Sequence, residues 1–448
     1  MKSLDRKRLH KTHCWDYSKQ VDTITRYLAG HEKQAADRKI GVEFEHFILD
    51  KQTLAAVSYY GAAGVEETMT KLLTKRWQGE QEYDHLLALE KEGTRITLEP
   101  GAQFELSIKP LRTIAEIESE YLQFLADVIP ILEDQKQILV CAGYHPQSKI
   151  ADIPFIPKAR YKFMSDYFRT KGRFAINMMK GTASMQVAVD YTSEPDFSKK
   201  FRVANGLSSV IAAMFDNSPF FEGALWDKNG LRIFIWQNCD NDRCGLVKGA
   251  LTDNFGYADY AKYVLDVPPV FFTDGKSVRS TGTTPFRDLF DHDNHAIQSI
   301  EHMLAMVFPD VRAKQFLEIR MADSVPYPLN LAGAALWKGL LYNKKSLEKA
   351  EALLAGLAEA DVERSKESVI KTGLDAVLGQ QSVSEIGRTL VACARQGLEE
   401  REQHYLTPIE EILEQGKNPT VVTKERLSSG KAQAIEWCVL NDVLNRIA

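Results

Sequence analysis

Cysteine and long apolar runs are scarce in this 448-residue sequence, and their scarcity excludes several classes of protein. The six cysteines are too few and too scattered for a disulfide framework, so we expect free thiols. Cys239 and Cys244 are close in sequence but have no second pair or histidine nearby, which excludes a typical structural zinc site. No apolar run approaches the roughly 18 residues that span a bilayer, and the N-terminus lacks a signal-peptide core. These absences predict a cytoplasmic protein with no membrane partner.

Positive charge is not in excess either, because the formal net charge is -5. A nucleic-acid-binding protein is usually basic, so we expect no nucleic-acid partner. The basic residues near the N-terminus form a short, interrupted run that is typical of a solvated helix or tail. The sequence also has no recognisable Ser-His-Asp or Cys-His pattern that would indicate a nucleophilic side chain.

Hydrophobic periodicity predicts a mixed α/β chain whose C-terminal part is helical. Strands are predicted over residues 41–50, 95–99, 103–107, 138–146, 182–190, 231–237 and 315–321. Helices are predicted over residues 1–37, 115–137 and 199–215, and three more follow after about residue 330. Pro130 predicts a kink or a break in the second of these helices. In the absence of a Pro/Gly-rich linker, we expect one integrated unit: a catalytic domain over 1–345 with a helical N-terminal segment, and a helical region over 346–448 packed on it.

Acidic residues inside predicted strands are the main candidates for a functional site. Glu43 and Glu45 share one strand face because side chains alternate along a strand. Two neighbouring carboxylates repel unless a cation, a proton or a basic group neutralises them. Mg²⁺ suits such a pair, since it prefers oxygen ligands and often shares them with phosphate. Glu99 and Glu105 flank a Pro-Gly turn in LEPGAQFEL and are candidates of the same kind.

Glu318 and Arg320 share the face of another predicted strand, which sets an anion beside a fixed cation, as a metal–phosphate site would. Gln186 lies on the polar face of the strand over 182–190. Guanidinium groups that suit carboxylate or phosphate ligands also belong to Arg160, Arg232 and Arg243. Each of these groups also fits a solvated strand face or an ordinary ion pair. Residue types and spacing alone therefore indicate only a mixed α/β enzyme with an Mg²⁺–phosphate site.

Eight collinear segments resemble the plant-type glutamate–cysteine ligase family, which also includes bacterial enzymes. They are GVEFEHFILD (41–50), ITLEPGAQFELSIKPL (96–111), PKARYKFM (157–164), NMMKGTASMQVAVDY (177–191), AAMFDNSPFFEG (212–223), RIFIWQNCDNDRCG (232–245), YVLDVPPVFF (263–272) and FPDVRAKQFLEIRMAD (308–323). The patterns EPGxQFEL and VRxKxxLExR are the most specific of these. The resemblance extends from about residue 15 to residue 345 and continues more weakly to the end.

This resemblance implies an α+β fold like the catalytic fold of glutamine synthetase: a curved antiparallel β-sheet funnel with surrounding helices and a helical C-terminal layer. It implies that Mg²⁺ ions are held by Glu43, Glu45, Glu99, Glu105 and Glu318. It places Arg320 against the transferred phosphate or the glutamate carboxylate. Arg232 and Arg243 would contact ATP phosphates or glutamate, and Gln186 is a further candidate for cofactor binding.

The implied reaction is ATP-dependent ligation of the glutamate γ-carboxylate to the amino group of cysteine through a γ-glutamyl phosphate. ATP and Mg²⁺ are the expected cofactors, glutamate and cysteine the expected partners, and a monomer or homodimer the expected assembly. Ala188 replaces an Asn that is usual in the family, and Gly181 replaces an Arg of plant members, which leaves a different amine acceptor open. A non-catalytic binding protein and a phosphagen-type kinase on the same fold also stay open, although the five metal-type glutamates are all kept.

Overall fold

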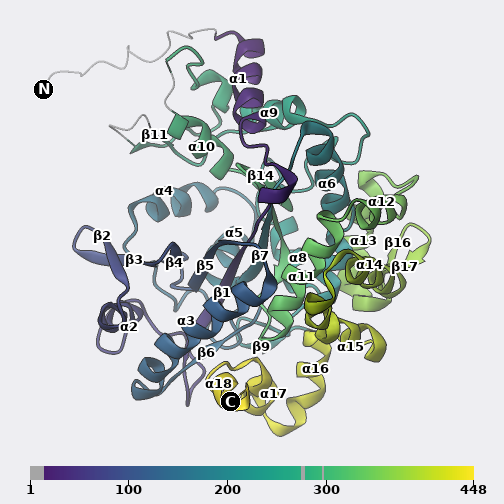
Figure 1. Cartoon of the computed structure of the whole chain (residues 1–448). Helices are drawn as coiled ribbons and strands as arrows, with labels where there is room; N and C mark the ends of the chain where they lie inside the picture. Colours follow the sequence, from purple (N-terminus) through teal and green to yellow (C-terminus); the bar gives the residue numbers. More distant parts are fainter. Residues whose placement is uncertain (1–14, 274–277, 295–296, 448) are drawn as a thin grey trace, which may run out of the picture.

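A computed structural model describes residues 15–273, 278–294 and 297–447, with a large antiparallel β-sheet at its centre (Figure 1). Nine strands of the described chain form this sheet in the order β14-β15-β7-β1-β5-β4-β3-β2, and β6 pairs with one end of β1. The strands are β1 (Ile40–Asp50), β2 (Gln78–Glu82), β3 (His85–Lys91), β4 (Thr94–Leu98), β5 (Phe104–Leu111), β6 (Gln137–Val140), β7 (Ser184–Val189), β14 (Val311–Ala313) and β15 (Leu317–Asp323). The predicted fold, an antiparallel sheet surrounded by helices, is confirmed.

The central strand β1 shows how the two faces of the sheet come to differ. Val42 and Phe44 point into the hydrophobic core and are almost fully buried. Glu43 and Glu45 alternate with them and therefore point to the opposite face. The register between β1 and β5 sets Glu45 opposite Glu105. Alternation along neighbouring strands thus gathers polar side chains on one face of the sheet.

The helices that pack on the apolar face of the sheet include α3 (Ile114–Asp134) and α11 (Leu329–Leu341). Helix α3 begins with a capping box in which Thr113 and Glu116 satisfy each other's backbone N–H groups. Pro130 lies inside α3, and the helix continues through it, so a break at this proline is excluded. The buried stripe of α3, which includes Ile117 and Phe124, packs on the sheet and offsets the hydrogen bond that proline removes.

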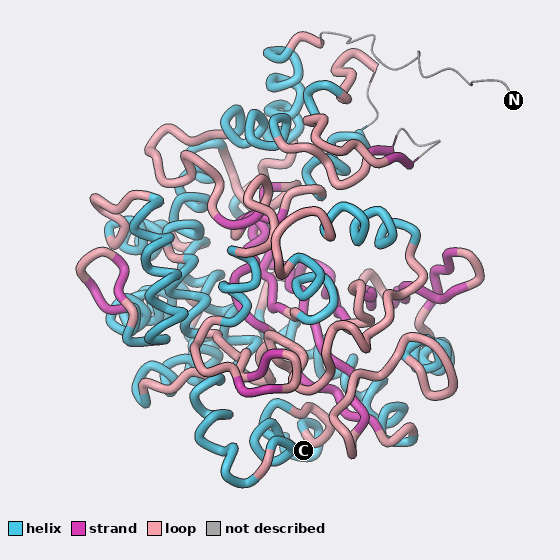
Figure 2. The backbone as a smooth tube through the Cα atoms, turned by 180° about the vertical axis from the view of Figure 1, so that it is seen from behind, coloured by secondary structure: helices cyan, strands magenta, loops and turns pink. Residues whose placement is uncertain are grey.

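Helices also surround the sheet at its edges, and those of the C-terminal region form a layer along one side (Figures 1 and 2). This layer contains α12 (Lys344–Ala352), α13 (Glu359–Thr372), α14 (Val383–Gly397), α15 (Thr407–Gln415) and α16 (Pro419–Glu425), whereas α17 (Lys431–Ile435) and α18 (Val443–Ile447) lie at the bottom of the view in Figure 1. The earlier helices are α1 (Tyr17–Ala29), α2 (Val65–Leu72), α4 (Ala159–Phe168), α5 (Ala175–Gly181), α6 (Glu194–Gly206), α7 (Ser208–Met214), α8 (Leu231–Gln237), α9 (Tyr257–Asp266) and α10 (Ile297–Ala305). Short strand pairs are β8 (Phe220–Phe221) with β9 (Ala224–Leu225), β10 (Cys244–Gly245) with β13 (Phe308–Pro309), β11 (Phe272–Thr273) with β12 (Val278–Arg279), and β16 (Val377–Leu378) with β17 (Gln381–Ser382).

The segment 231–237, predicted as a strand, is helix α8, so that prediction is wrong. Its β-branched and aromatic residues favour strands, but tertiary contacts override this preference. Gly230 adopts a φ of 55° at the N-cap, and the Asp216 carboxylate accepts a hydrogen bond from its N–H at 2.8 Å. Leu231 and Ile235 are fully buried four residues apart, which is helical spacing.

Several predicted boundaries also change. The helix predicted over 199–215 is divided into α6 and α7, and the helix predicted over 1–37 is α1, with residues 1–14 outside the described residues. The last 20 residues form the short helices α17 and α18 instead of one helix. The chain between them becomes extended at Val439, which bridges to Val140 of β6. A backbone hydrogen bond from Leu440 to Leu139 follows, so pairing with β6 ends the first of these helices.

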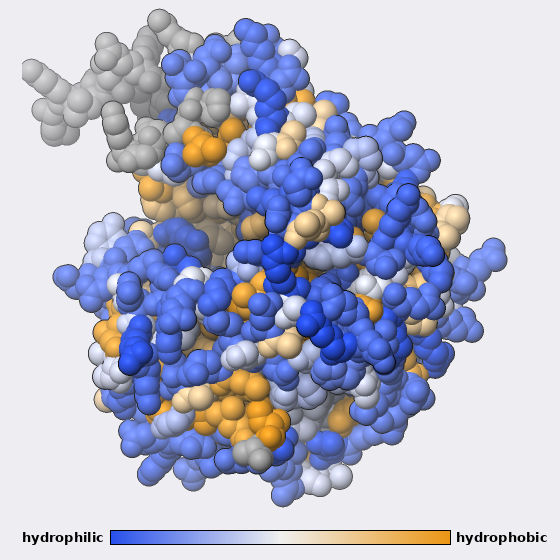
Figure 3. All heavy atoms as spheres, viewed as in Figure 1, coloured by the Kyte–Doolittle hydropathy of each residue, from blue (hydrophilic) through white to orange (hydrophobic). Residues whose placement is uncertain are grey.

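The surface seen from the side of Figure 1 is largely hydrophilic and is hollowed below α10, towards α4 (Figure 3). Across the described ranges, no helix has both the length and the apolar character needed to cross a bilayer.

Candidate active site

A cavity of about 250 Å³ lies on the polar face of the sheet. Strands β1, β5, β7 and β15 form its floor, and helices α4, α5 and α8 supply parts of its wall. Its charged and amide side chains belong to Glu43, Glu45, Glu99, Gln103, Glu105, Arg160, Gln186, Arg232, Arg312, Lys314 and Arg320. Four of the five glutamates predicted from the sequence therefore share one cavity.

Hydroxyl and amide donors fix the orientation of two of these carboxylates. Glu45 accepts hydrogen bonds from the Ser184 N–H at 2.7 Å, the Ser184 hydroxyl at 2.9 Å and the Gln186 amide at 3.1 Å. Glu105 accepts hydrogen bonds from the Thr97 hydroxyl at 2.6 Å and from the Ser107 hydroxyl on the next residue of its own strand face. Because these donors lie on β4, β5 and β7, the sheet itself holds both carboxylates towards the cavity.

Burial and mutual repulsion make these carboxyl groups unusually basic. Burial, together with the charges of Glu105 and Glu318, raises the pKa of Glu43 to about 7. Burial and the charges of Glu99 and Glu105 raise the pKa of Glu45 to about 8. The pKa of Glu105 is raised for the same reasons, with burial the larger cause. A cation bound among them would relieve the repulsion and displace the protons.

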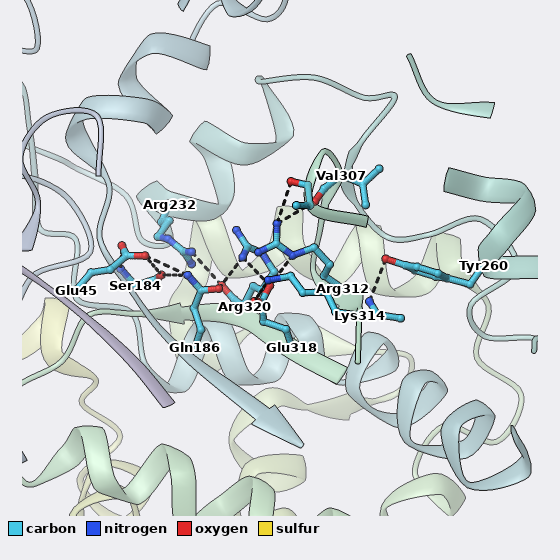
Figure 4. Close-up of polar contacts among 12 residues, drawn as sticks. Glu45, Ser184, Gln186, Arg232, Tyr260, Val307, Arg312, Lys314, Glu318 and Arg320 are labelled. Carbon is cyan, nitrogen blue, oxygen red and sulfur yellow. Dashed lines mark hydrogen bonds and ion pairs between the residues drawn. The ribbon is translucent and has the colours of Figure 1, made fainter. Parts of the chain in front are cut away.

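Glu318 lies in a different electrostatic setting, because three cations surround it (Figure 4). Its carboxylate is 2.6 Å from Arg312 Nε, 2.8 Å from Lys314 Nζ and 2.9 Å from Arg320 Nη1. Burial alone would raise its pKa, but these three cations hold the pKa well below its usual range. Glu318 is therefore ionised, and both of its oxygens are engaged by cations rather than turned towards the other glutamates.

Gln186 connects the carboxylates to this cluster of cations. Its amide nitrogen donates to Glu45 at 3.1 Å, and its amide oxygen accepts from Arg320 Nη1 at 2.6 Å. Arg320 in turn contacts Glu318, so an unbroken series of polar contacts runs from Glu45 to the cations (Figure 4). The structure thus brings Gln186 together with Arg320 and Glu318, and the last two lie side by side as their strand spacing predicted.

Arg232 reaches the cavity from α8 rather than from a strand. Its Nη1 and Nη2 atoms donate to the backbone oxygens of Arg320, Met321 and Ala322 at 2.9–3.3 Å. Its Nε atom is buried and has no hydrogen-bond partner in the described part of the chain. The edge of a guanidinium that Nε and Nη2 form matches the two oxygens of a carboxylate in bidentate geometry. A smaller cavity of about 50 Å³, lined by Arg232, Trp236 and Asp310 among others, lies against this arginine.

Arg243 does not lie at the cavity, in contrast to the role expected for it. It is fully buried, and its Nε atom donates to Asp240 at 2.7 Å. Its terminal nitrogens donate to the Tyr167 hydroxyl and to the backbone oxygens of Met306 and Pro268 at 2.5–2.6 Å. With its donors engaged in this way, Arg243 links four segments of the fold and has no route to a substrate.

Arg312 and Lys314 belong to the site but were not assigned a role from the sequence. Both lie within the pattern VRxKxxLExR, two residues apart, so strand alternation puts them on one face. The register between β14 and β15 sets Arg312 opposite Glu318. That spacing is the signal that could have identified them, but a cross-strand partner is not visible in one sequence.

A third cavity of about 240 Å³ continues along the same face of the sheet. It shares Glu43 and Gln186 with the main cavity, and its other charged residues include Glu318, Lys39, Arg95 and Lys109. The two positions that depart from the family pattern lie apart from one another. Ala188 lines this third cavity, opposite Gly41 of β1. At Gly181, a Cβ would lie 2.5 Å from the ring of Tyr144, so a side chain does not fit there.

The residues of the main cavity fit Mg²⁺ as a partner of phosphate. Within the described ranges, no three carboxylate, imidazole or thiol groups converge closely enough to hold a metal ion by themselves. Repulsion keeps uncompensated carboxylates apart, and Mg²⁺ is usually held by one or two carboxylates together with water and phosphate oxygens. The pKa values of Glu43 and Glu45 stay raised although Arg312 and Lys314 act on Glu43 and Arg232 acts on Glu45, which fits two carboxylates that a further cation would stabilise.

Comparison with known proteins identifies the family of this site. The sequence profile of glutamate-cysteine ligase family 2 (GCS2) matches residues 39–433. Chloroplastic glutamate–cysteine ligases from Nicotiana tabacum and Arabidopsis thaliana are each 31% identical, over 89% and 93% of this chain and 78% and 81% of their own length. A glutamate–cysteine ligase from Francisella tularensis, solved with AMP, has the same fold with a TM-score of 0.55 and 12% identity, covering 92% of this chain and 88% of that one. The chain belongs to glutamate-cysteine ligase family 2.

Proposed function

We propose that the chain joins the γ-carboxylate of glutamate to the amino group of cysteine, with ATP as the energy source. The observation that supports this most is the series of contacts from Glu45 through Gln186 to Arg320 (Figure 4). It sets a carboxylate-rich end beside a cation-rich end within one cavity. Carboxylates hold metal ions, and guanidinium and ammonium groups bind phosphoryl oxygens, so the arrangement suits phosphoryl transfer.

The first step forms the acyl phosphate. We place ATP in the third cavity, with its phosphates towards the wall shared with the main cavity. Arg312, Lys314 and Arg320 then lie beside the γ-phosphoryl group and stabilise its charge as it passes to the γ-carboxylate of glutamate. Mg²⁺ would be held by Glu43, Glu45, Glu99 and Glu105, and it would supply charge neutralisation at the phosphates.

Arg232 is proposed to hold the α-carboxylate of glutamate. The unpartnered Nε atom and the adjacent Nη2 atom form one donor edge, and that edge lies where two cavities meet. Asp310 also lines the smaller cavity, where Lys366 at 2.7 Å already neutralises its carboxylate. Burial lowers the pKa of Arg232, and a bound carboxylate would compensate the cost of keeping the cation buried.

The second step forms the amide. The amino group of cysteine attacks the carbonyl carbon of the γ-glutamyl phosphate, the C–N bond forms, and the C–O bond to phosphate breaks. The nitrogen loses one proton in the process, and inorganic phosphate leaves. Met164 and Met178 line the main cavity and provide polarisable contacts that suit a thiol side chain.

The test is phosphate release from ATP, Mg²⁺ and glutamate with no acceptor, with cysteine and with a panel of other amines. Cysteine-dependent release with γ-glutamylcysteine as the product supports the proposal. Phosphate release with another amine but not with cysteine would show that this amine, and not cysteine, is the acceptor. No ADP under any of these conditions would rule out ligase activity.

We also propose the cellular compartment and the assembly of the protein. Cys141, Cys239, Cys244, Cys393 and Cys438 are free thiols, which suits a reducing compartment such as the cytoplasm. The cavity side chains named above all belong to one chain, so a monomer can carry a whole site, and a homodimer would carry two.

We also propose that the chain is divided into a catalytic domain over 1–345 and a helical region over 346–448.

A further inference from the structure

The start of helix α16, in the C-terminal region, is inserted into the core at the end of α7. Asn418 and Thr420 are fully buried there. The Asn418 side chain donates to the backbone oxygen of Ala213 at 2.9 Å, and the Thr420 N–H donates to the backbone oxygen of Asp216 at 2.9 Å. The Thr420 hydroxyl also donates to one carboxylate oxygen of Asp216 at 2.9 Å and accepts a hydrogen bond from the Ser218 N–H at 2.8 Å. A residue more than 200 positions away thus determines how Asp216 is held.

Asp216 also binds the N-terminus of helix α8. Its second carboxylate oxygen accepts a hydrogen bond from the N–H of Gly230, the N-cap residue of α8, at 2.8 Å. Asp216 is 1% exposed, and burial raises its pKa. A buried carboxylate is costly unless several donors satisfy it, and here Thr420, Ser218 and Gly230 do so. The carboxylate therefore connects α16 and the first turn of α8 through hydrogen bonds to both.

Helix α8 depends on such contacts for its position. It has seven residues, and a helix that short is not stable by itself in water. Arg232 and Trp236 lie four residues apart on the face of α8 that borders the cavities. A shift of the first turn would move the free edge of Arg232, and a displacement of about 1 Å can cost a site about 100-fold.

We infer that Thr420 and Asp216 are positioning residues for substrate binding, an inference that rests on the proposed function. Thr420 holds the Asp216 carboxylate, Asp216 holds the N-terminus of α8, and α8 presents Arg232 to the glutamate α-carboxylate. The C-terminal helical region thereby contributes to glutamate affinity without touching glutamate. A purely structural role for Thr420 would instead lower the stability of the protein and leave glutamate affinity unchanged.

The experiment compares three variants of the full chain. Thr420→Val keeps the shape of the side chain and removes the hydroxyl, whereas Thr420→Ser keeps the hydroxyl. Thr423→Val is the matched control, because Thr423 is fully buried in the same helix and its hydroxyl accepts from Trp437 rather than contacting Asp216. The measurements are KM and kcat for glutamate, thermal unfolding, and amide hydrogen exchange over residues 230–237.

We expect Thr420→Val to raise KM for glutamate about tenfold, which corresponds to about 1.4 kcal/mol, and to change kcat less than about threefold. Amides of α8 should exchange faster in this variant. Thr420→Ser should restore KM to within about twofold of the wild type. Thr423→Val should lower the unfolding temperature and leave both KM and α8 exchange unchanged.

The inference is overturned if Thr420→Val destabilises the protein as Thr423→Val does while KM and α8 exchange stay at wild-type values. If Thr420→Val does not fold, Asp216→Asn takes its place, because an amide has one acceptor oxygen and can no longer accept from both Thr420 and Gly230. An unchanged KM in that variant would overturn the inference equally. A wild-type enzyme without glutamate- and cysteine-dependent phosphate release would show that the proposed function has failed, and the positioning role would fall with it. α8 exchange would then report only the structural link.

Discussion

Replacing Glu45 by glutamine tests whether the buried carboxylates form a metal site. In the metal-free protein, burial and the charges of Glu99 and Glu105 raise the pKa of Glu45 from 4.5 to about 8. A carboxyl group whose pKa is higher in the folded than in the unfolded state destabilises the fold when it is ionised. This penalty is absent below pH 4.5, grows between pH 4.5 and about 8, and is complete above that range.

The size of the effect follows from the pKa. At about 1.4 kcal/mol for each pKa unit, the full penalty is on the order of 5 kcal/mol at high pH. Part of the gain from Glu45→Gln is lost, because glutamine must rearrange the hydrogen bonds from Ser184 and Gln186. Neighbouring carboxyl groups also share protons with Glu45, which reduces the gain further. We therefore expect Glu45→Gln to stabilise the metal-free protein by about 1–3 kcal/mol at about pH 8.5, and by almost nothing at about pH 5.

Urea unfolding at both pH values, in a chelator and then in saturating Mg²⁺, measures this difference. Mg²⁺ should stabilise the wild type and have little effect on Glu45→Gln, because a ligand stabilises only the state that binds it. Glu402→Gln is the control: Glu402 is buried and paired with Lys338 at 2.7 Å, away from the cavity. The loss of this ion pair should destabilise the protein at both pH values, and Mg²⁺ should still stabilise the variant as it does the wild type. The reasoning is refuted if Glu45→Gln is no more stable than the wild type at about pH 8.5 and responds to Mg²⁺ in the same way.

Four further outcomes are expected. Arg232→Lys removes the Nε–Nη2 edge, so KM for glutamate should rise about 100-fold in steady-state assays, and the unfolding temperature should fall because backbone oxygens of residues 320–322 lose their donors. Arg243→Met should lower the free energy of unfolding by about 3 kcal/mol, because it leaves the buried Asp240 with only the more distant Lys171 as a cation; a raised KM with unchanged stability would contradict this. Arg312→Met should lower kcat about 100-fold or more, measured as ADP formation, since it removes a cation beside the transferred phosphoryl group. Titration calorimetry should show Mg²⁺ affinity rising from about pH 6 to about pH 8 with proton release, because Glu43 and Glu45 have pKa values of about 7 and about 8; pH-independent affinity would argue against these ligands.

The carboxylates on the central strands could be identified from the sequence because strand geometry is local. A period of two fixes that Glu43 and Glu45 share a face, whatever the rest of the chain does. The same rule identified the pair of Glu318 and Arg320, and the structure places both in one wall of the site. Family resemblance then connected these strands, which lie far apart in the sequence.

Helix α8 shows where local reasoning fails. Its apolar, β-branched sequence favours a strand, and the helix exists because Gly230 and Asp216 cap it while Leu231 and Ile235 enter the core. The orientation of Arg232 follows from this helix. The sequence could not predict that Arg232 lies at the cavity and Arg243 does not. Both side chains bind backbone oxygens of segments that are distant in the sequence, which leaves the Nε atom of Arg232 unpaired and pairs the donors of Arg243.

The sequence by itself determined which strands carry acidic residues, which face those residues share, and which family the motifs resemble. These properties depend on residue types and their spacing along the chain, and both can be read directly from a sequence. Only the tertiary structure decided which charges neutralise one another: three cations hold Glu318 ionised, whereas burial and neighbouring carboxylates keep the pKa values of Glu43 and Glu45 raised. The physical reason is that electrostatic energy depends on distance and burial in three dimensions, and folding brings together groups that the sequence keeps far apart.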